Sequence, residues 1–271
     1  MTDSAERHWY VGHEPLTKRL NVRAELKRYS LDPLYPLLLE LGRADSVVVL
    51  QDEFSRYRET YACFVLALQR FLPEMSLAVR WARGPYYKRK YGGKYTPSER
   101  KLADAYNRVA PYLHLDYYAC ILWARVLLDR TASLSRYLLT EKNKPSFTSF
   151  ADHKRFFSRL SGPYGLHEEY ASYVRSSTSW FDEPLKLVRD KFIVHASPQH
   201  MRIFGYPGGG HELNMMIMIP DGDDEAKPLS KVRLVSVGIP QMAREVHAFL
   251  AWFGEYGVAA LRSGRSRRPA V

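Results

Sequence analysis

Long stretches of helical periodicity constrain the fold of this chain more than any other feature of its sequence. In residues 52–74, DEFSRYRETYACFVLALQRFLPE, large apolar side chains recur every three or four positions, the spacing of one buried helix face. Residues 97–141 continue this period, and the TPSE that opens them supplies a capping residue, a proline and an early acid. We therefore expect two long helices, the first ending at Pro73, and a mainly α fold.

Shorter helices are expected on either side of these two. Asp32 and Pro33 are suited to cap and open a helix, and Gly42 is suited to end it. Further helical periodicity is found in residues 152–160, 167–197 and 240–261. The last of these segments is amphipathic and predicts a helix that closes the fold.

The hydrophobic period changes after Pro198. The stretches MRIFGY, ELNMMIMIP and KVRLVSVG alternate or run apolar over short spans, and glycine-rich and acidic turns separate them. This pattern predicts a small antiparallel β element near residues 202–237. Because no internal repeat and no linker interrupts the chain, we expect residues 1–271 to form a single helical domain.

Composition narrows the class of protein. Hydrophobic residues make up 46% of the chain, enough for a sizeable core, and 40 Lys and Arg against 29 Asp and Glu give a formal charge of +11. Such a surface attracts polyanions, of which RNA and DNA are the commonest in a cell. Cys63 and Cys120 lie in apolar helical segments, which indicates reduced thiols in a cytoplasmic protein. No run of eighteen consecutive apolar residues occurs, so we expect no membrane span.

One segment combines cations with aromatic residues. Residues 83–101, RGPYYKRKYGGKYTPSERK, hold seven Lys or Arg residues, four tyrosines, three glycines and two prolines. We expect a loop here, in which tyrosines stack on bases and cations contact phosphates. The candidate RNA-binding residues are Lys88, Arg89, Lys90 and Lys94. The alternative interpretation is a solvated turn between two helices.

Two charged residues stand beside the apolar stripe of the second long helix. Arg125 and Asp129 are four positions apart, so their side chains lie next to each other on a helix surface. Such a pair is usually exposed and structural. If it is partly buried, it can instead orient another group, and we retain Arg125 and Asp129 as supporting residues of a site.

The segment KLVRDKFIVHASPQH, residues 186–200, carries the remaining candidates. We expect a helix here with Asp182 as its cap and Pro184 in its first turn. At about 100° per residue, Arg189 and His195 flank an apolar stripe on opposite sides. They would converge only if two copies of the helix met along the stripe, which predicts a homodimer with a composite site. The alternative is that both residues merely pack or face solvent.

Arg189, the polar Asp190 and His195 near a helix end, in a chain rich in helices, resemble the motif of the HEPN superfamily. The stretch LLDRTA, residues 127–132, is similar to the long helix that such domains place against the motif helix. The resemblance covers roughly residues 100–200. It implies a HEPN-like helical bundle with a core at about 100–261 and an N-terminal helical extension at about 1–96. The strands expected at 202–237 depart from the minimal bundle of this family.

The resemblance also implies a function. Active HEPN proteins are metal-independent endoribonucleases of toxin–antitoxin, phage-defence and RNA-processing systems, and many act as homodimers. His195 would be the general acid or base, Arg189 would stabilise charge on the phosphorane, and Asp190 would orient one of them. No cofactor is expected, and no HExxH, CxxC or Asp-rich metal motif is present. An antitoxin or a nucleotidyltransferase is a possible partner. The alternative function is a non-catalytic HEPN-like RNA-binding or protein-interaction module.

Overall fold

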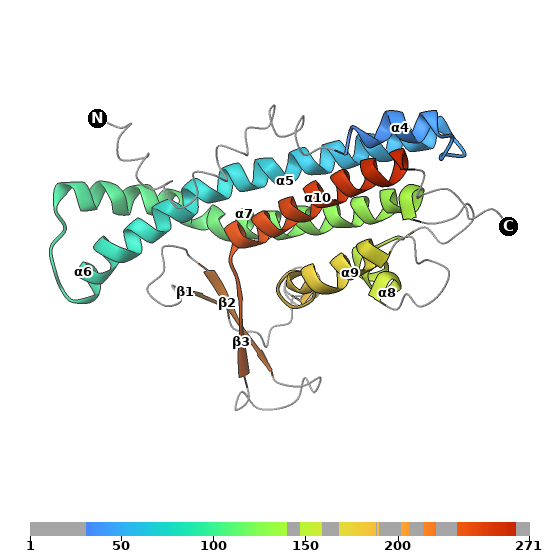
Figure 1. The fold of residues 1–271 in the computed structure, drawn as a ribbon. Coiled ribbons are helices and arrows are strands. Elements are labelled where there is room, and N and C mark those ends of the chain that lie inside the picture. Colours follow the sequence, from blue (N-terminus) through green and yellow to red (C-terminus); the bar gives the residue numbers. More distant parts are fainter. Residues whose placement is uncertain are drawn as a thin grey trace. The chain divides into compact units, whose positions relative to one another are not determined.

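The computed structural model describes residues 31–139, 147–158, 168–187, 189, 202–205, 214–220 and 232–263. The chain divides into two compact units, each assembled from segments that are far apart in the sequence. Unit 1 comprises Met1–Leu20, Leu66–Leu122 and Glu183–Met242, and unit 2 comprises Asn21–Val65, Trp123–Asp182 and Ala243–Val271. Most of the described residues are helical, which confirms the expected mainly α fold (Figure 1).

Two long helices supply residues to both units. The first is α5 (Val47–Trp81), and the second is α7 (Pro97–Leu139), which begins at the proline expected from the sequence. The TPSE start acts as predicted: the Thr96 hydroxyl accepts a bond from the Glu99 amide, and the Glu99 carboxylate accepts one from the Thr96 amide at 2.8 Å. This reciprocal capping box satisfies two amides that a helix start leaves without helical partners.

Unit 2 packs four shorter elements against its portions of these long helices: α4 (Leu34–Glu40), α8 (Phe150–Ser158), α9 (Glu168–Ser177) and most of α10 (Ile239–Arg262). Aromatic contacts join α10 to its neighbours: Phe249 lies 5.1 Å from Phe150 of α8, and Trp252 stacks 3.8 Å from Tyr173 of α9, measured between ring centroids. An ion pair of 2.7 Å between Glu53 and Arg136 links α5 to α7. The core of unit 2 is therefore aromatic, and the ion pair between the two long helices lies at its edge.

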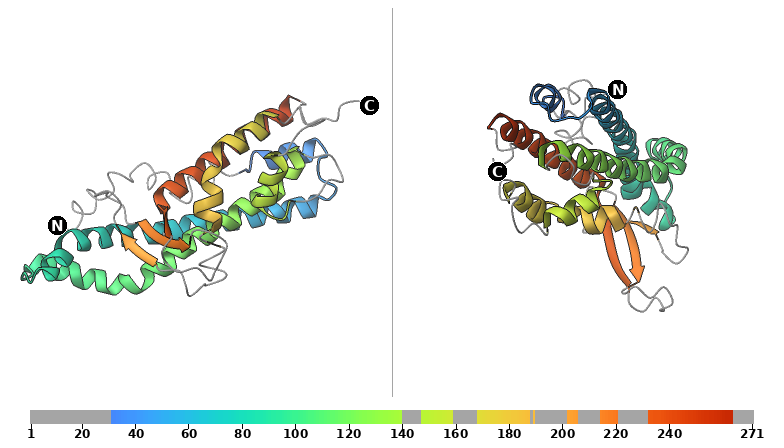
Figure 2. Two further views of the ribbon diagram at one scale, coloured as in Figure 1. Left: turned by 90° about the horizontal axis from the view of Figure 1, so that it is seen from below. Right: turned by 90° about the vertical axis from the view of Figure 1, so that its right-hand side faces the viewer.

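Unit 1 combines the remaining parts of α5 and α7 with three strands, β1 (Arg202–Gly205), β2 (Asn214–Pro220) and β3 (Val232–Val237). The strands pair antiparallel in the order β1-β2-β3, with Phe204 opposite Met215 and Ile217 opposite Val235; Figure 2 shows them from two further sides. Between the helices, Phe71 of α5 lies 5.7 Å from Tyr117 of α7, so the two pack side by side.

Pro73 does not end the first long helix, as the sequence had led us to expect. It lies inside α5, which continues to Trp81. The residues around it, Leu72 and Met75, are buried, whereas Pro73 itself is exposed. Pro73 thus removes a helical hydrogen bond on the exposed side of α5, and core packing on the opposite side sustains the helix.

The start of α4 also differs from the prediction. The helix begins after Pro33, but no side chain caps it. The Asp32 carboxylate instead accepts a bond of 2.6 Å from Arg58 of α5, so a tertiary ion pair replaces the local cap. The expected stop at Gly42 is confirmed, since its φ of 57° is a conformation that favours glycine.

One stretch of the described chain, Val47–Tyr86, is long and apolar enough by length and composition to cross a bilayer, although it contains no run of eighteen consecutive apolar residues. Core helices of soluble proteins have the same character, and half of its most apolar window is buried within the structure. Both cysteines are free thiols; Cys120 is buried and Cys63 is half-buried.

Candidate functional site

In the segment 83–101, called the tip below, residues 83–90 are helical, so the expectation of a loop was wrong there, whereas residues 91–96 belong to no helix. A π-helix, η1 (Ala82–Tyr86), continues α5, and a short helix, α6 (Tyr87–Lys90), follows. Ala82 and Pro85 are buried, so apolar contacts hold this stretch against the fold. Pro85 cannot donate the normal helical bond, and a π-turn is one way in which a helix accommodates this.

The two glycines of the tip end α6. Gly92 has a φ of 75°, and its amide donates to the Arg89 carbonyl at 3.2 Å. The next amide, that of Gly93, donates to the Lys88 carbonyl at 2.7 Å. These two bonds form a Schellman motif, a common helix end in which glycine adopts the left-handed conformation. The motif fixes the backbone on both sides of Tyr91.

Aromatic rings gather at the base of the tip. Trp81, at the end of α5, stacks on Tyr106 of α7 with ring centroids 4.1 Å apart and an angle of 10° between planes. Tyr86 contacts Trp81 at 5.0 Å while 41% of its surface stays exposed. Tyr91 is 76% exposed. The tip therefore presents two tyrosines to solvent, one of them supported by a stacked pair.

Lys88 differs from the other predicted RNA-binding residues. Its ammonium group lies 2.7 Å from the Glu99 carboxylate, which also completes the cap of α7. This bond from Lys88, together with those from Thr96, lowers the pKa of Glu99 to about 2. Lys88 thus ties α6 to the start of α7, and its charge is already matched.

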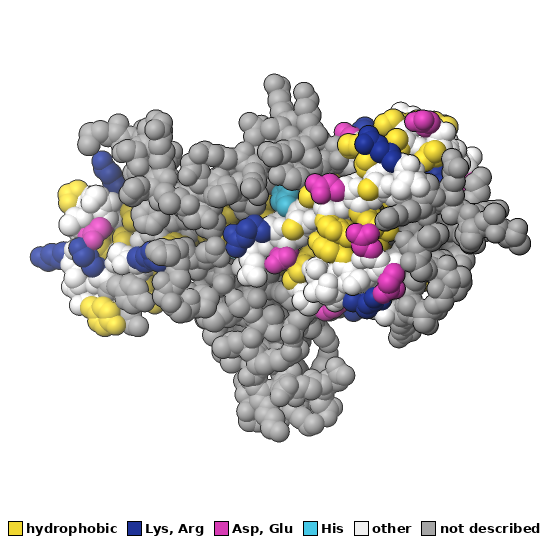
Figure 3. All heavy atoms as spheres, viewed as in Figure 1, with side chains coloured by type: hydrophobic (Ala, Val, Ile, Leu, Met, Phe, Trp, Pro, Cys, Tyr) yellow, Lys and Arg dark blue, Asp and Glu magenta, His cyan; other side chains and the backbone are white. Residues whose placement is uncertain are grey.

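Arg89 and Lys94 have exposed side chains, whereas the side chain of Lys90 lies outside the described part of the structure. Across the tip, seven cations stand against one carboxylate, that of Glu99, so these nineteen residues carry +6 of the chain's formal +11. In Figure 3, Lys and Arg side chains cluster at the end of the view where Figure 1 labels α6. The positive charge of the chain is therefore concentrated rather than spread evenly.

The motif segment begins with a π-helix, η3 (Phe181–Leu187), and not with the α-helix that we expected. The carboxylate of Asp182 does not cap a helix but accepts a bond from Lys154 of α8. Phe181 and Leu185, two apolar residues of η3, are fully buried. A wheel drawn at 100° per residue does not apply to a π-helix, because its hydrogen bonds span five residues.

Of the predicted catalytic residues, the structure describes Arg189. Its side chain is half-buried, and its backbone has the same π-helical character as η3. Asp190 and His195 lie outside the described residues. Arg189 and the tip both belong to unit 1, whereas Arg125 and Asp129 belong to unit 2.

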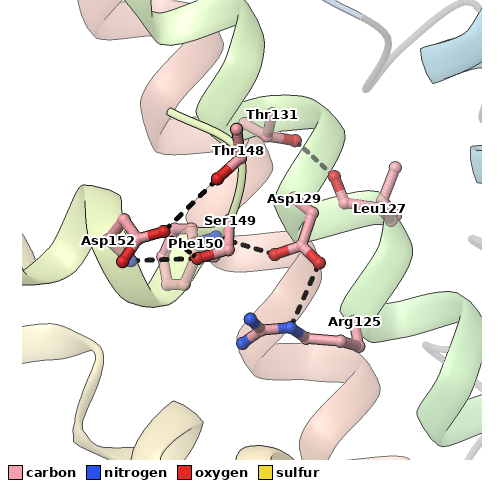
Figure 4. Close-up of polar contacts among 8 residues, drawn as sticks. All are labelled: Arg125, Leu127, Asp129, Thr131, Thr148, Ser149, Phe150 and Asp152. Atoms are coloured by element: carbon pink, nitrogen blue, oxygen red, sulfur yellow. Dashed lines mark hydrogen bonds and ion pairs between the residues drawn. The ribbon is translucent and has the colours of Figure 1, made fainter. Parts of the chain in front are cut away.

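Arg125 and Asp129 form the predicted pair, with Arg125 Nε 3.2 Å from Asp129 Oδ2 (Figure 4). The pair is not a surface feature, because only 4% of the Arg125 side chain is exposed. The guanidinium lies 4.6 Å above the centre of the Phe181 ring, a cation–π contact with the first residue of η3. The pair is thus partly buried, which is the condition of the second alternative, and its role as a support of the catalytic site stays a prediction.

Asp129 also holds the start of α8. Its second oxygen, Oδ1, accepts a bond of 2.7 Å from the Phe150 amide (Figure 4). Ser149 supplies the ordinary cap by accepting a bond from the Asp152 amide at 3.1 Å. A carboxylate at a helix start also interacts favourably with the helix dipole. Asp129 therefore connects α7 to α8 directly and to η3 through Arg125, a positioning role within unit 2.

Sequence reasoning missed a buried polar hub at His153. Its Nδ1 lies 3.0 Å from the Ser135 hydroxyl and its Nε2 lies 2.6 Å from the Tyr170 hydroxyl, and the ring has no solvent exposure. Burial lowers the pKa of His153 to about 3, which keeps the imidazole neutral. The spacing of His153 from Phe150 and Phe157, three and four positions, was the signal for a core histidine.

A second missed feature joins α5 to α7 in unit 1. Asp116 is buried, and Arg70 lies 3.1 Å from its Oδ2. Burial, and then the neighbouring Asp116 carboxylate, raise the pKa of Glu74 to about 7. Burial, and then the carboxylates of Asp116 and Glu74, raise the pKa of the Cys120 thiol, so this thiol is not activated as a nucleophile.

Comparison of the chain with family models, with curated proteins and with solved structures gives no match. Within the described residues, no group of three or more His, Cys, Asp or Glu side chains is placed to hold a metal ion. The candidate site is thus defined by the tip and by the segment that carries Arg189.

Proposed function

We propose that this protein binds RNA and that the tip is its contact surface. The observation that carries the proposal is the concentration of seven cations and a single, already engaged carboxylate in nineteen residues. Cations that contact phosphates release counterions, so a patch of this kind binds polyanions in a salt-dependent way. Arg89 and Lys94 are described cations with exposed side chains that could make such contacts.

The test compares two double variants of equal charge. Arg89→Ala/Lys94→Ala removes two exposed cations of the tip, and Arg130→Ala/Arg155→Ala removes two exposed cations of unit 2. Affinity for a fluorescent oligouridine is measured over a range of salt concentrations. The tip variant is expected to lower the slope of log affinity against log salt by about 1.4, since each phosphate contact contributes roughly 0.7. Equal losses in both variants would refute a specific role for the tip.

A second proposal is that the protein is a HEPN-like, metal-independent endoribonuclease with Arg189, Asp190 and His195 as its catalytic residues. It is favoured by the π-helical character of the segment that leads to Arg189, because π-turns in helices occur frequently at functional sites. Burial of Phe181 beneath Arg125 gives this segment a rigid starting point. Arg189 would stabilise phosphorane charge, and His195 would transfer the proton.

Cleavage is tested with wild-type protein, Arg189→Ala and His195→Ala on total RNA in the presence of EDTA. The wild type is expected to leave 2′,3′-cyclic phosphate ends, because the neighbouring hydroxyl is the attacking group. Each substitution should reduce cleavage by about 10²-fold or more while circular dichroism stays unchanged. Background cleavage by all three proteins would leave the non-catalytic RNA-binding alternative.

The same proposal includes a homodimer through the motif segment, cytoplasmic location and, in a toxin–antitoxin setting, an antitoxin or nucleotidyltransferase partner. Light scattering of the purified protein tests the dimer. A monomer at micromolar concentration would remove the composite site made of two copies of Arg189 and His195.

A further inference from the structure

We propose that the tip selects unpaired RNA strands, with Tyr86 and Tyr91 as platforms on which exposed bases stack. This inference rests on the RNA binding proposed above and names the class of RNA. Stacking on aromatic side chains is sequence-tolerant because every base presents a π-face. In a duplex those faces are covered by neighbouring base pairs, so only phosphates and groove edges are accessible.

Tyr86 is held in place before any ligand binds. Trp81 and Tyr106 stack almost parallel, and Tyr86 packs on Trp81 with ring centroids 5.0 Å apart and an inclination of 51°. Even so, 41% of Tyr86 remains exposed. A ring that is held against Trp81 while part of its surface stays exposed loses little conformational freedom when a base stacks on it, which favours binding.

Tyr91 is the more exposed of the two rings, and its backbone is fixed by the Schellman motif that follows it. The bonds from Gly92 and Gly93 return to α6, so the residue between the helix and the glycines has a defined position. With 76% of its surface exposed, Tyr91 contributes little to the core. A large aromatic residue in such a position is suited to contact a partner rather than to stabilise the fold.

Exposed cations flank Tyr91 along the chain. Arg89 precedes Tyr91 by two residues and Lys94 follows it by three, and both side chains are exposed. The carboxylate of Glu99 is engaged with Lys88 and Thr96. A base stacked on Tyr91 would thus have positive charge near the phosphates on either side, the combination found in proteins that bind single strands.

The experiment measures the affinity of the full chain for a single-stranded RNA, for a DNA strand of the same sequence and for an RNA duplex of the same length. Wild-type protein is compared with Tyr91→Ala, with the control Tyr91→Phe and with Tyr86→Ala. Tyr91→Ala is expected to weaken binding of both single strands by about tenfold, from the loss of one stacked base. Duplex binding should change by less than about twofold, and Tyr91→Phe should behave as the wild type because the ring is retained.

The possible outcomes separate this inference from the function on which it rests. If the wild type binds single strands but Tyr91→Ala and Tyr86→Ala bind them equally well, stacking is refuted while RNA binding stands. The inference is also overturned if Tyr91→Ala weakens duplex and single strands alike. Should the wild type bind none of the three nucleic acids, the proposed function itself fails. Since Tyr91 is largely exposed, loss of folding does not complicate its variants.

Discussion

The neutral imidazole of His153 should make the stability of this protein fall steeply in mildly acidic solution. The ring is fully buried and lies between the hydroxyl groups of Ser135 and Tyr170. Its pKa is about 3 in the folded chain and about 6.5 when the chain is unfolded. As the pH falls below about 6.5, the unfolded chain takes up a proton that the folded chain does not.

Linkage converts this difference into a magnitude. Each pH unit between about 6.5 and 3 lowers the free energy of unfolding by roughly 1.4 kcal/mol. The His153 contribution is complete above about pH 6.5, and about 2 kcal/mol of it is lost at pH 5. Replacing His153 with Gln, which has a hydrogen-bond donor and an acceptor but does not titrate, removes the pH dependence of stability that His153 contributes. The pH dependence that other groups contribute remains.

The assay is urea unfolding followed by far-ultraviolet circular dichroism at about pH 7.5 and pH 5. His153→Gln should be less stable than the wild type at the higher pH, by about 1–3 kcal/mol, since it disturbs a packed and hydrogen-bonded site. The difference between the two proteins should then shrink by about 2 kcal/mol at the lower pH. If the difference in stability between His153→Gln and the wild type is the same at both pH values, the wild-type His153 imidazole takes up protons in the folded protein. That result would refute the reasoning.

Three further outcomes follow from the packing. Gly257→Leu should lower the free energy of unfolding by about 2 kcal/mol or more in chemical denaturation, because even a Cβ at this position would lie 2.8 Å from Leu138. The control Ala259→Leu, on the exposed face of α10, should have little effect. Glu74→Gln should raise the urea midpoint at about pH 8 but hardly at pH 4.5. The reason is that a carboxyl group with a raised pKa destabilises the fold progressively as the pH rises from about 4.5 to 7. Equal shifts of the midpoint at both pH values would contradict this. Asp129→Asn should cost about 2–3 kcal/mol in thermal unfolding, since the buried guanidinium beside it loses its charged partner, and a change below about 0.5 kcal/mol would show that the pair contributes little.

The helix ends that were predicted best are those whose capping residues lie within a few positions of one another in the sequence. The start of α7 depends on Thr96 and Glu99, which are three positions apart, and the end of α4 depends on the conformational freedom of Gly42. The same kind of signal was present at Gly92 and Gly93, which end α6, but the density of turn-forming residues around them was interpreted as a loop. The two glycines thus indicated the end of a helix, but the turn-rich composition of the segment led us to predict a loop.

The candidate site was predictable only in part. The pairing of Arg125 with Asp129 follows from their spacing on one helix, but their burial depends on Phe150 and Phe181, which arrive from later segments. The role of Lys88 depends on Glu99, whose carboxylate was available to it only because α6 turns back toward α7. No pattern along the chain distinguishes a cation that faces solvent from one that is already paired.

The sequence by itself determined the helical class of this protein, the start of α7 and the concentration of positive charge in residues 83–101, because periodicity, capping and charge are properties of neighbouring residues. The tertiary structure decided that α5 runs through Pro73, that Asp32 pairs with Arg58 instead of capping a helix, and that His153 is neutral. Each of these depends on which side of a residue meets the core and which meets water. That partition is set by segments distant in the chain, since a residue is buried or left in water only once those segments have packed.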